Sequence, residues 1–179
     1  MAEAVRIHPL AGRLHAGNGV SLEPAAETGR TNLRADAAGV AAVEKALGLQ
    51  LPVKPKSSAG NKETSALWLG PDEWLVITGN PALQGKLEAL GNDTCSAVDI
   101  SHRNTAILVS GPKARLALMS GCPQDLRDTA FPVGACSRTI LGKSEIVLWR
   151  EADDRYRVEC WRSFSDYVWK YLVDAAKSA

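Results

Sequence analysis

The segment from Val98 to Arg103 carries the strongest candidates for chemistry in this sequence. It reads Val-Asp-Ile-Ser-His-Arg and lies between two apolar runs typical of strands. Polar side chains placed there can reach a cleft, where Asp99 or His102 would act as a general base or contact a ligand. Alternatively, Asp99 and Ser101 satisfy backbone groups of a turn, while His102 and Arg103 are solvated or meet a partner. Because no second catalytic group lies nearby in the sequence, we favour the turn interpretation.

Other catalytic and cofactor-binding motifs are absent from the sequence. It has no glycine-rich phosphate loop, no Gly-x-Ser-x-Gly elbow for a nucleophilic serine and no His-Glu-x-x-His pair. The histidines and cysteines do not have the spacing of a zinc site. Two carboxylate pairs, Asp72-Glu73 and Asp153-Asp154, are expected in hairpin turns, where acidic residues hydrogen-bond the backbone. The sequence therefore predicts no catalytic, cofactor-binding or metal-binding residue on this chain.

Composition and charge indicate a globular, water-soluble protein. Of 179 residues, 45% are hydrophobic and 23% are charged, and no run approaches the roughly 18 apolar residues of a membrane span. The 21 Lys and Arg residues offset 20 Asp and Glu residues, so nucleic acid is not an expected partner. The four cysteines are scattered and are expected to be free thiols. Since no secretory signal opens the chain, we predict a cytoplasmic protein.

The hydrophobic pattern divides the chain into an arm and one domain. Residues 1–31 carry no sustained period and several glycines, which predicts an irregular N-terminal arm. Residues 32–179 are expected to form a single α+β domain that begins with a helix over 32–50. This helix is expected to end at Gly48.

From residue 66 onward, pairs of short strands alternate with single helices. Strands are expected at 66–69, 74–78, 97–100, 106–109, 138–141, 146–149 and 156–160, and helices at 80–91, 111–121 and 163–176. Charged residues alternate with Val158 and Cys160, so we expect the last strand to be half exposed. The final helix is expected to bury Phe164, Tyr167 and Val168 on its apolar face. This order predicts an antiparallel sheet of β-β-α units with helices packed on one face.

The five tryptophans divide into two groups. Alternation within the strands predicts Trp68 and Trp149 in the core. The others, Trp74, Trp161 and Trp169, flank turns or lie near a helix start. Partly exposed tryptophan is enriched at protein interfaces, so a docking surface is the second interpretation of these three.

Several segments occur together in a specific order. They are Leu69-Gly-Pro-Asp-Glu-Trp-Leu-Val76, Val98-Asp-Ile-Ser-His-Arg103 with Val109-Ser-Gly-Pro-Lys-Ala-Arg115, Gly121-Cys-Pro-Gln-Asp-Leu126, Ala130-Phe-Pro-Val-Gly-Ala-Cys136 and Trp161-Arg-Ser-Phe-Ser-Asp-Tyr167. Over about residues 66–172, the sequence resembles the gamma subunits of heterotetrameric sarcosine oxidase. That family belongs with the folate-dependent aminomethyltransferase (T-protein) superfamily, so the resemblance implies a T-protein-like fold.

The resemblance implies a small noncatalytic subunit of a larger enzyme. The complex oxidatively demethylates sarcosine to glycine and reduces oxygen to hydrogen peroxide. With tetrahydrofolate, it also forms 5,10-methylenetetrahydrofolate. In that family, FAD, FMN, NAD and the tetrahydrofolate site belong chiefly to the alpha and beta subunits and zinc to the delta subunit, so no cofactor is expected on this chain.

One departure from the superfamily bears on function. Members that catalyse one-carbon transfer carry a Gly-Gly-x-x-Asp-Asp type stretch between two later strands, where this chain has Gly142-Lys-Ser-Glu145. We therefore expect the chain to dock on the alpha, beta and delta subunits rather than to catalyse the transfer. The candidate subunit contacts are Ser101, His102, Arg103, Trp161, Arg162 and Tyr167. The alternatives are a stand-alone folate-binding one-carbon module, supported by the segment around Asp99, and a small interaction protein outside any metabolic complex.

Overall fold

Two antiparallel sheets form the centre of the computed structural model, which describes residues 7–179. The strands of the first sheet, sheet A, are β1 (His15–Gly17), β2 (Val20–Pro24), β8 (Asn104–Ser110), β9 (Cys136–Leu141), β10 (Ser144–Ala152) and β11 (Arg155–Trp161). They lie in the order β1-β2-β8-β11-β10-β9. The strands of sheet B are β3 (Gly29–Arg34), β4 (Ser58–Gly60), β5 (Thr64–Gly70), β6 (Glu73–Thr78) and β7 (Ser96–Asp99). Their order is β4-β5-β6-β3-β7.

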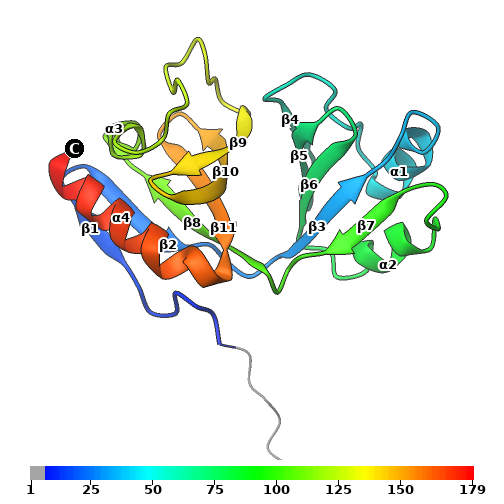
Figure 1. Cartoon of the computed structure of the whole chain (residues 1–179), viewed down its shortest axis with the longest axis horizontal. Helices are drawn as coiled ribbons and strands as arrows, with labels where there is room; N and C mark the ends of the chain where they lie inside the picture. Colours follow the sequence, from blue (N-terminus) through cyan, green and yellow to red (C-terminus); the bar gives the residue numbers. More distant parts are fainter. Residues whose placement is uncertain (1–6) are drawn as a thin grey trace, which may run out of the picture.

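Helices cover the outer face of each sheet. They are α1 (Val40–Leu47), α2 (Leu83–Glu88), α3 (Ala114–Met119) and α4 (Ser165–Ser178), with a single 3₁₀ turn, η1 (Arg162–Phe164), before α4. Figure 1 shows α3 and α4 outside sheet A, and α1 and α2 outside sheet B. Within residues 7–179, none of these helices is long and apolar enough to cross a membrane.

Hydrophobic clusters fill the spaces between these layers. The cluster between sheet A and its helices includes Tyr156 and Leu172, which are 1% and 0% exposed. A second cluster surrounds Trp74 between sheet B and its helices. A smaller cluster joins the inner faces of the sheets, where Leu75 of β6 and Val147 of β10 are buried. The two sheets therefore pack on each other as well as on their helices.

The irregular arm expected over residues 1–31 is wrong for its described part, which holds β1, β2 and the start of β3. Asn18 and Gly19 form the turn between β1 and β2 with φ of 50° and 77°, the positive values that a tight hairpin turn needs. Strand β2 then pairs with β8 and buries Val20 and Leu22. Such short strands show no period in the sequence. Residues 1–6 of the arm lie outside the described residues.

The helix expected over residues 32–50 is also wrong in its first part. Residues 32–34 complete β3, and α1 begins only at Val40. Leu33 is fully buried in the strand. Its seven-residue separation from Val40 imitates a helical repeat across the intervening turn. The predicted end is confirmed, because Gly48 caps α1 with φ of 65°.

The elements after residue 60 follow the predicted order. Each expected strand from residue 66 onward, and each later helix, has its counterpart in β5 to β11 and α2 to α4. The predicted fold class of antiparallel strands covered by helices on one face is confirmed. The strands form two sheets, each with its own helical cover.

Charged side chains of β11 face sheet B, so the half-exposed strand expected at 156–160 is wrong. Arg157 is 7% exposed and Glu159 is 1% exposed. The Glu159 carboxylate accepts the Nε–H of Arg157 at 2.7 Å and, through its other oxygen, the Nε–H of Arg30 at 2.7 Å. Since Arg30 belongs to β3, this buried triad ties the sheets together. Alternation predicts which residues share a face of a strand but not what that face meets.

A second ion pair crosses between the sheets nearer the surface. Arg138 of β9 donates to both carboxylate oxygens of Glu73 in β6, at 2.6 and 3.2 Å. The side-chain amide of Asn32 donates to the same carboxylate at 2.7 Å. The Arg138 hydrogen bonds are the main cause that lowers the pKa of Glu73. Glu73 is thus a strand residue rather than the expected turn residue, whereas the Asp153-Asp154 pair does lie in a turn.

All four cysteines are free and buried. Burial raises the pKa of Cys136 and of Cys160 to about 12. Their thiols therefore act as small core side chains in the folded protein. The expectation of free thiols is confirmed.

Replacing Glu159 by glutamine is expected to lower the free energy of unfolding by about 3 kcal/mol, because the buried guanidinium groups of Arg30 and Arg157 each lose their nearest carboxylate. Urea unfolding followed by tryptophan fluorescence measures this loss. Glu63→Gln changes an exposed carboxylate and is the control, with an expected change below about 0.5 kcal/mol. A loss at Glu159 no larger than that of the control would contradict the role of the triad.

The Glu73–Arg138 pair is expected to make stability depend on pH. Because Arg138 holds the folded-state pKa of Glu73 below the ordinary value of 4.5, the unfolded chain takes up this proton at a higher pH than the folded chain. The stabilisation is complete above pH 4.5 and is lost as the pH falls through the lowered folded-state value. Urea unfolding should therefore show wild type more stable than Glu73→Gln at about pH 7, with a much smaller difference at about pH 3. A difference that is equal at both pH values would contradict this assignment.

Candidate functional site

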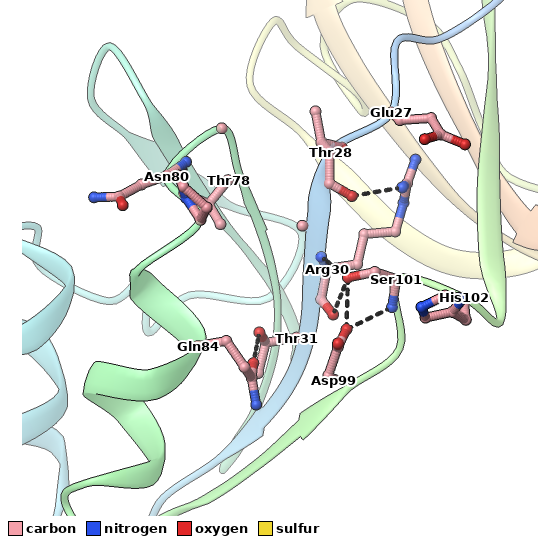
Figure 2. A pocket seen from close by; sticks show the side chains of 13 residues that line it. Glu27, Thr28, Arg30, Thr31, Thr78, Asn80, Gln84, Asp99, Ser101 and His102 are labelled. Atoms are coloured by element: carbon pink, nitrogen blue, oxygen red, sulfur yellow. Dashed lines mark hydrogen bonds between the residues drawn. The ribbon is translucent and has the colours of Figure 1, made fainter. Parts of the chain in front are cut away.

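The turn between β7 and β8 carries the predicted residues Ser101, His102 and Arg103. At its start, the Asp99 carboxylate accepts the backbone N–H and the hydroxyl of Ser101, at 2.8 and 2.5 Å. The Ser101 hydroxyl oxygen accepts the backbone N–H of Arg30 at 2.8 Å (Figure 2). Asp99 and Ser101 thus shape the turn and fix it to β3. The turn interpretation of these two residues is confirmed.

A pocket of about 360 Å³ opens beside this turn. Asp99 and His102 both line it, as expected for polar residues that follow a strand. On another part of its wall, the Thr31 hydroxyl donates to the Gln84 carboxamide at 2.6 Å (Figure 2). The Asp99 carboxylate, whose alternative role was a general base, is thus engaged in shaping the turn, and His102 is exposed at its end.

Arg103 leaves the same turn and lies over the ring of Trp161 at the end of β11. Its guanidinium carbon is 5.3 Å from the ring centroid, a favourable cation–π distance. The backbone N–H of Arg162 donates to the Arg103 carbonyl at 2.7 Å. The Phe164 ring lies 5.9 Å from the Trp161 ring. We call Arg103, Trp161, Arg162 and Phe164 the aromatic corner, and three of its residues are predicted contacts.

Tyr167 makes its contacts elsewhere, at the turn between β9 and β10. Its hydroxyl accepts the backbone N–H of Lys143 at 3.1 Å, and its ring lies 6.2 Å from the Tyr171 ring. Gly142 of that turn has φ of 59°, and a side chain there would collide with the Tyr167 hydroxyl. Tyr167 thus holds the hairpin in place, but the residue is 38% exposed, so its expected burial on the apolar face of the last helix is wrong.

Trp74 and Trp169, for which a docking surface was the second interpretation, belong to the interior, so that interpretation is wrong for them. Trp74 is 2% exposed and its indole N–H donates to the Pro52 carbonyl at 2.8 Å. Trp169 is 7% exposed in the cluster beneath α4. Trp68 and Trp149, expected in the core, are partly buried against the hydrophobic clusters.

Phe164 is the residue of the aromatic corner that the sequence reasoning missed. It was expected on the buried face of the last helix, but it is 44% exposed and Trp161 is 40% exposed. The helical period places residue 164 one turn before the buried Val168. The 3₁₀ turn η1 has three residues per turn, so it rotates Phe164 away from that face.

The aromatic corner has the chemistry of a binding surface. Within residues 7–179, no group of three or more histidine, cysteine, aspartate or glutamate side chains could hold a metal ion. Tryptophan and arginine are enriched among the residues that dominate protein interfaces. Exposed aromatic rings beside two guanidinium groups therefore suit contact with another protein.

Comparison of sequences identifies relatives over most of the chain. Residues 31–178 match the model of the sarcosine oxidase, gamma subunit family. The sarcosine oxidase subunit gamma of Corynebacterium sp. strain U-96 is 35% identical over 161 residues, which cover 87% of this chain and 78% of that protein. The Arthrobacter sp. subunit gamma is 38% identical over 141 residues, which cover 77% of this chain and 70% of that protein.

Comparison of structures agrees with the sequences. A chain of the heterotetrameric sarcosine oxidase from Corynebacterium sp. U-96, solved with pyrrole 2-carboxylate, has a TM-score of 0.88 and 33% identity, covering 97% of this chain and 95% of that chain. The glycine cleavage system aminomethyltransferase T from Bartonella henselae has a TM-score of 0.61 and 12% identity, covering 87% of this chain and 45% of that chain. The second likeness confirms the T-protein-like fold. On the family match and the relatives together, this chain belongs to the sarcosine oxidase gamma subunit family.

Proposed function

We propose that this chain is the small gamma subunit of a heterotetrameric sarcosine oxidase. The complex would oxidatively demethylate sarcosine to glycine, with oxygen reduced to hydrogen peroxide. With tetrahydrofolate present, it would form 5,10-methylenetetrahydrofolate. The observation that carries this proposal is the likeness, over nearly the full length of both chains, to a chain of the Corynebacterium heterotetramer.

In the proposed complex, this chain has a structural role and the reaction belongs to its partners. The connection between β9 and β10 is a two-residue turn of Gly142 and Lys143, at the position where one-carbon-transfer enzymes of the superfamily carry an acidic stretch. The Asp99 carboxylate is engaged with Ser101. Both features support a noncatalytic chain.

The proposed partners are the alpha, beta and delta subunits in the cytoplasm. They would carry FAD, FMN, NAD, the tetrahydrofolate site and zinc. The proposed contacts on this chain are Ser101, His102, Arg103, Trp161, Arg162 and Tyr167. The aromatic corner supports this choice, because it groups three of them on an exposed surface.

A tagged copy of the chain, purified from cells of its source organism grown on sarcosine, is expected to bring down a large assembly. The assembly should have a flavin absorption spectrum and produce peroxide only when sarcosine is added. A colourless chain of about 19 kDa without partners would contradict the proposal.

The same material tests the stand-alone folate module. Calorimetry with tetrahydrofolate should give no heat of binding with the isolated chain. Binding that Asp99→Asn abolishes would instead assign a folate site to the pocket beside the β7–β8 turn. Full activity of the isolated chain on sarcosine would also overturn the subunit proposal.

A further inference from the structure

The arginines of this chain divide into two groups. Nine of those in residues 7–179 form ion pairs with carboxylates of the same chain: Arg13, Arg30, Arg34, Arg115, Arg127, Arg138, Arg150, Arg155 and Arg157. Only Arg103 and Arg162 have no carboxylate at ion-pair distance within this part of the chain. Both belong to the aromatic corner, so the corner holds the two guanidinium groups that carboxylates of the described residues leave unpaired.

The Arg103 guanidinium makes two contacts that position it and leave its terminal nitrogens available. Its Nε–H donates to the Asn104 side chain at 3.2 Å, and the Trp161 ring supports its face at 5.3 Å. Its two terminal Nη groups have no acceptor among residues 7–179. A guanidinium fixed in this way presents two parallel donors, which is the geometry that binds a carboxylate in a bidentate manner.

Arg162 contributes a second cation and anchors the surface. Its side chain donates to the Ile7 carbonyl, and its backbone N–H is bound to the Arg103 carbonyl. Trp161 and Phe164 beside it are exposed apolar rings. Apolar contact around such a surface excludes water and strengthens a charged hydrogen bond inside it.

We infer that the aromatic corner binds an acidic segment of a partner subunit, in which one carboxylate pairs with the Arg103 fork beside the Trp161 ring. This inference rests on the proposed function, because it names the chemistry of the partner at the proposed contact. The charge of the corner selects carboxylates. The formal net charge of the whole chain is only +1, so a protein carboxylate suits the corner better than a polyanion such as nucleic acid.

The test uses the complete complex, produced with wild-type chain or with a variant. The apparent Kd of the tagged chain is obtained by size exclusion over a dilution series, from the fraction that stays with the flavin-bearing assembly. Arg103→Gln is expected to raise this Kd about tenfold or more, since a charged hydrogen-bonded pair is lost. Arg103→Lys keeps the charge but not the paired donors, so it should remain roughly threefold weaker than wild type.

Lys86→Gln is the matched control, because it removes an exposed positive charge from α2 on the far side of sheet B. Its Kd should equal that of wild type. Circular dichroism and thermal unfolding should be unchanged in all three variants, since the substituted side chains are exposed. Raising the salt from about 50 to about 500 mM should weaken the wild-type complex more than the Arg103→Gln complex.

The outcomes separate this inference from the proposed function. If wild type joins the assembly and Arg103→Gln binds equally tightly, or if both show the same salt dependence, the acidic partner is refuted and the subunit assignment stands. If wild type itself joins no flavin-bearing assembly, the proposed function fails first. Weaker binding by Arg103→Gln with reduced salt dependence supports the inference.

Discussion

The Glu159 carboxylate is the point on which the arrangement of the two sheets depends. It lies in the interior with a guanidinium on each oxygen, one from its own strand and one from β3 of the opposite sheet. An ionised group is stable there only with both partners in place, so the triad admits one relative position of the sheets. Hydrophobic packing between the inner faces is less specific, since apolar side chains tolerate small shifts.

The buried triad is also linked to the turn and the strand that carry the exposed aromatic corner. The backbone N–H of Arg30 donates to the Ser101 hydroxyl in the β7–β8 turn, and the Arg30 side chain donates to the Glu159 carboxylate. Trp161 lies two residues beyond Glu159 on the same strand, and so on the same face. Arg103 meets Trp161 because β8 pairs with β11, which places Asn104 opposite Trp161. Arg30 adds a tie from β3 to both the strand and the turn that carry them.

Much of this architecture could be predicted from local sequence, but contacts between distant segments could not. Alternation and turn residues predict the strands after residue 66, and the pairs β5–β6, β9–β10 and β10–β11 are hairpins of neighbouring segments. The strands β7 and β8 are also neighbours in the chain, but they belong to different sheets. The pattern Arg157-Val-Glu159 shows one polar face, and solvent is the default explanation of such a face. Its true neighbour, Arg30, is 129 residues from Glu159 in the chain. The Asn18-Gly19 dipeptide is a local hairpin signal, but it stands among several other glycines in the first segment.

In the candidate site, too, local sequence predicts single residues, whereas their contacts depend on segments that are distant in the chain. Sequence motifs identified Arg103, Trp161 and Arg162 one by one, but their meeting depends on how β8 and β11 pair. The helical period predicts the wrong face for Phe164, because it does not indicate where 3₁₀ winding replaces α-helical winding. A position near a helix start suggests partial exposure for Trp169, but the residue lies in the cluster beneath α4. Size and aromatic character alone do not distinguish an interior anchor from an exposed one.

The strand orders of the two sheets have a consequence for synthesis on the ribosome. All strands of sheet B lie between Gly29 and Asp99, so this half can complete its hydrogen bonding once about the first hundred residues have emerged. In sheet A, β2 must wait for β8, and β11 then inserts between β8 and β10. The N-terminal hairpin therefore stays without its neighbour in the sheet until β8 has emerged, after the last strand of sheet B. The half that matures first carries the turn with Arg103, and the half that matures last supplies Trp161, so the aromatic corner is assembled only when the whole chain is available.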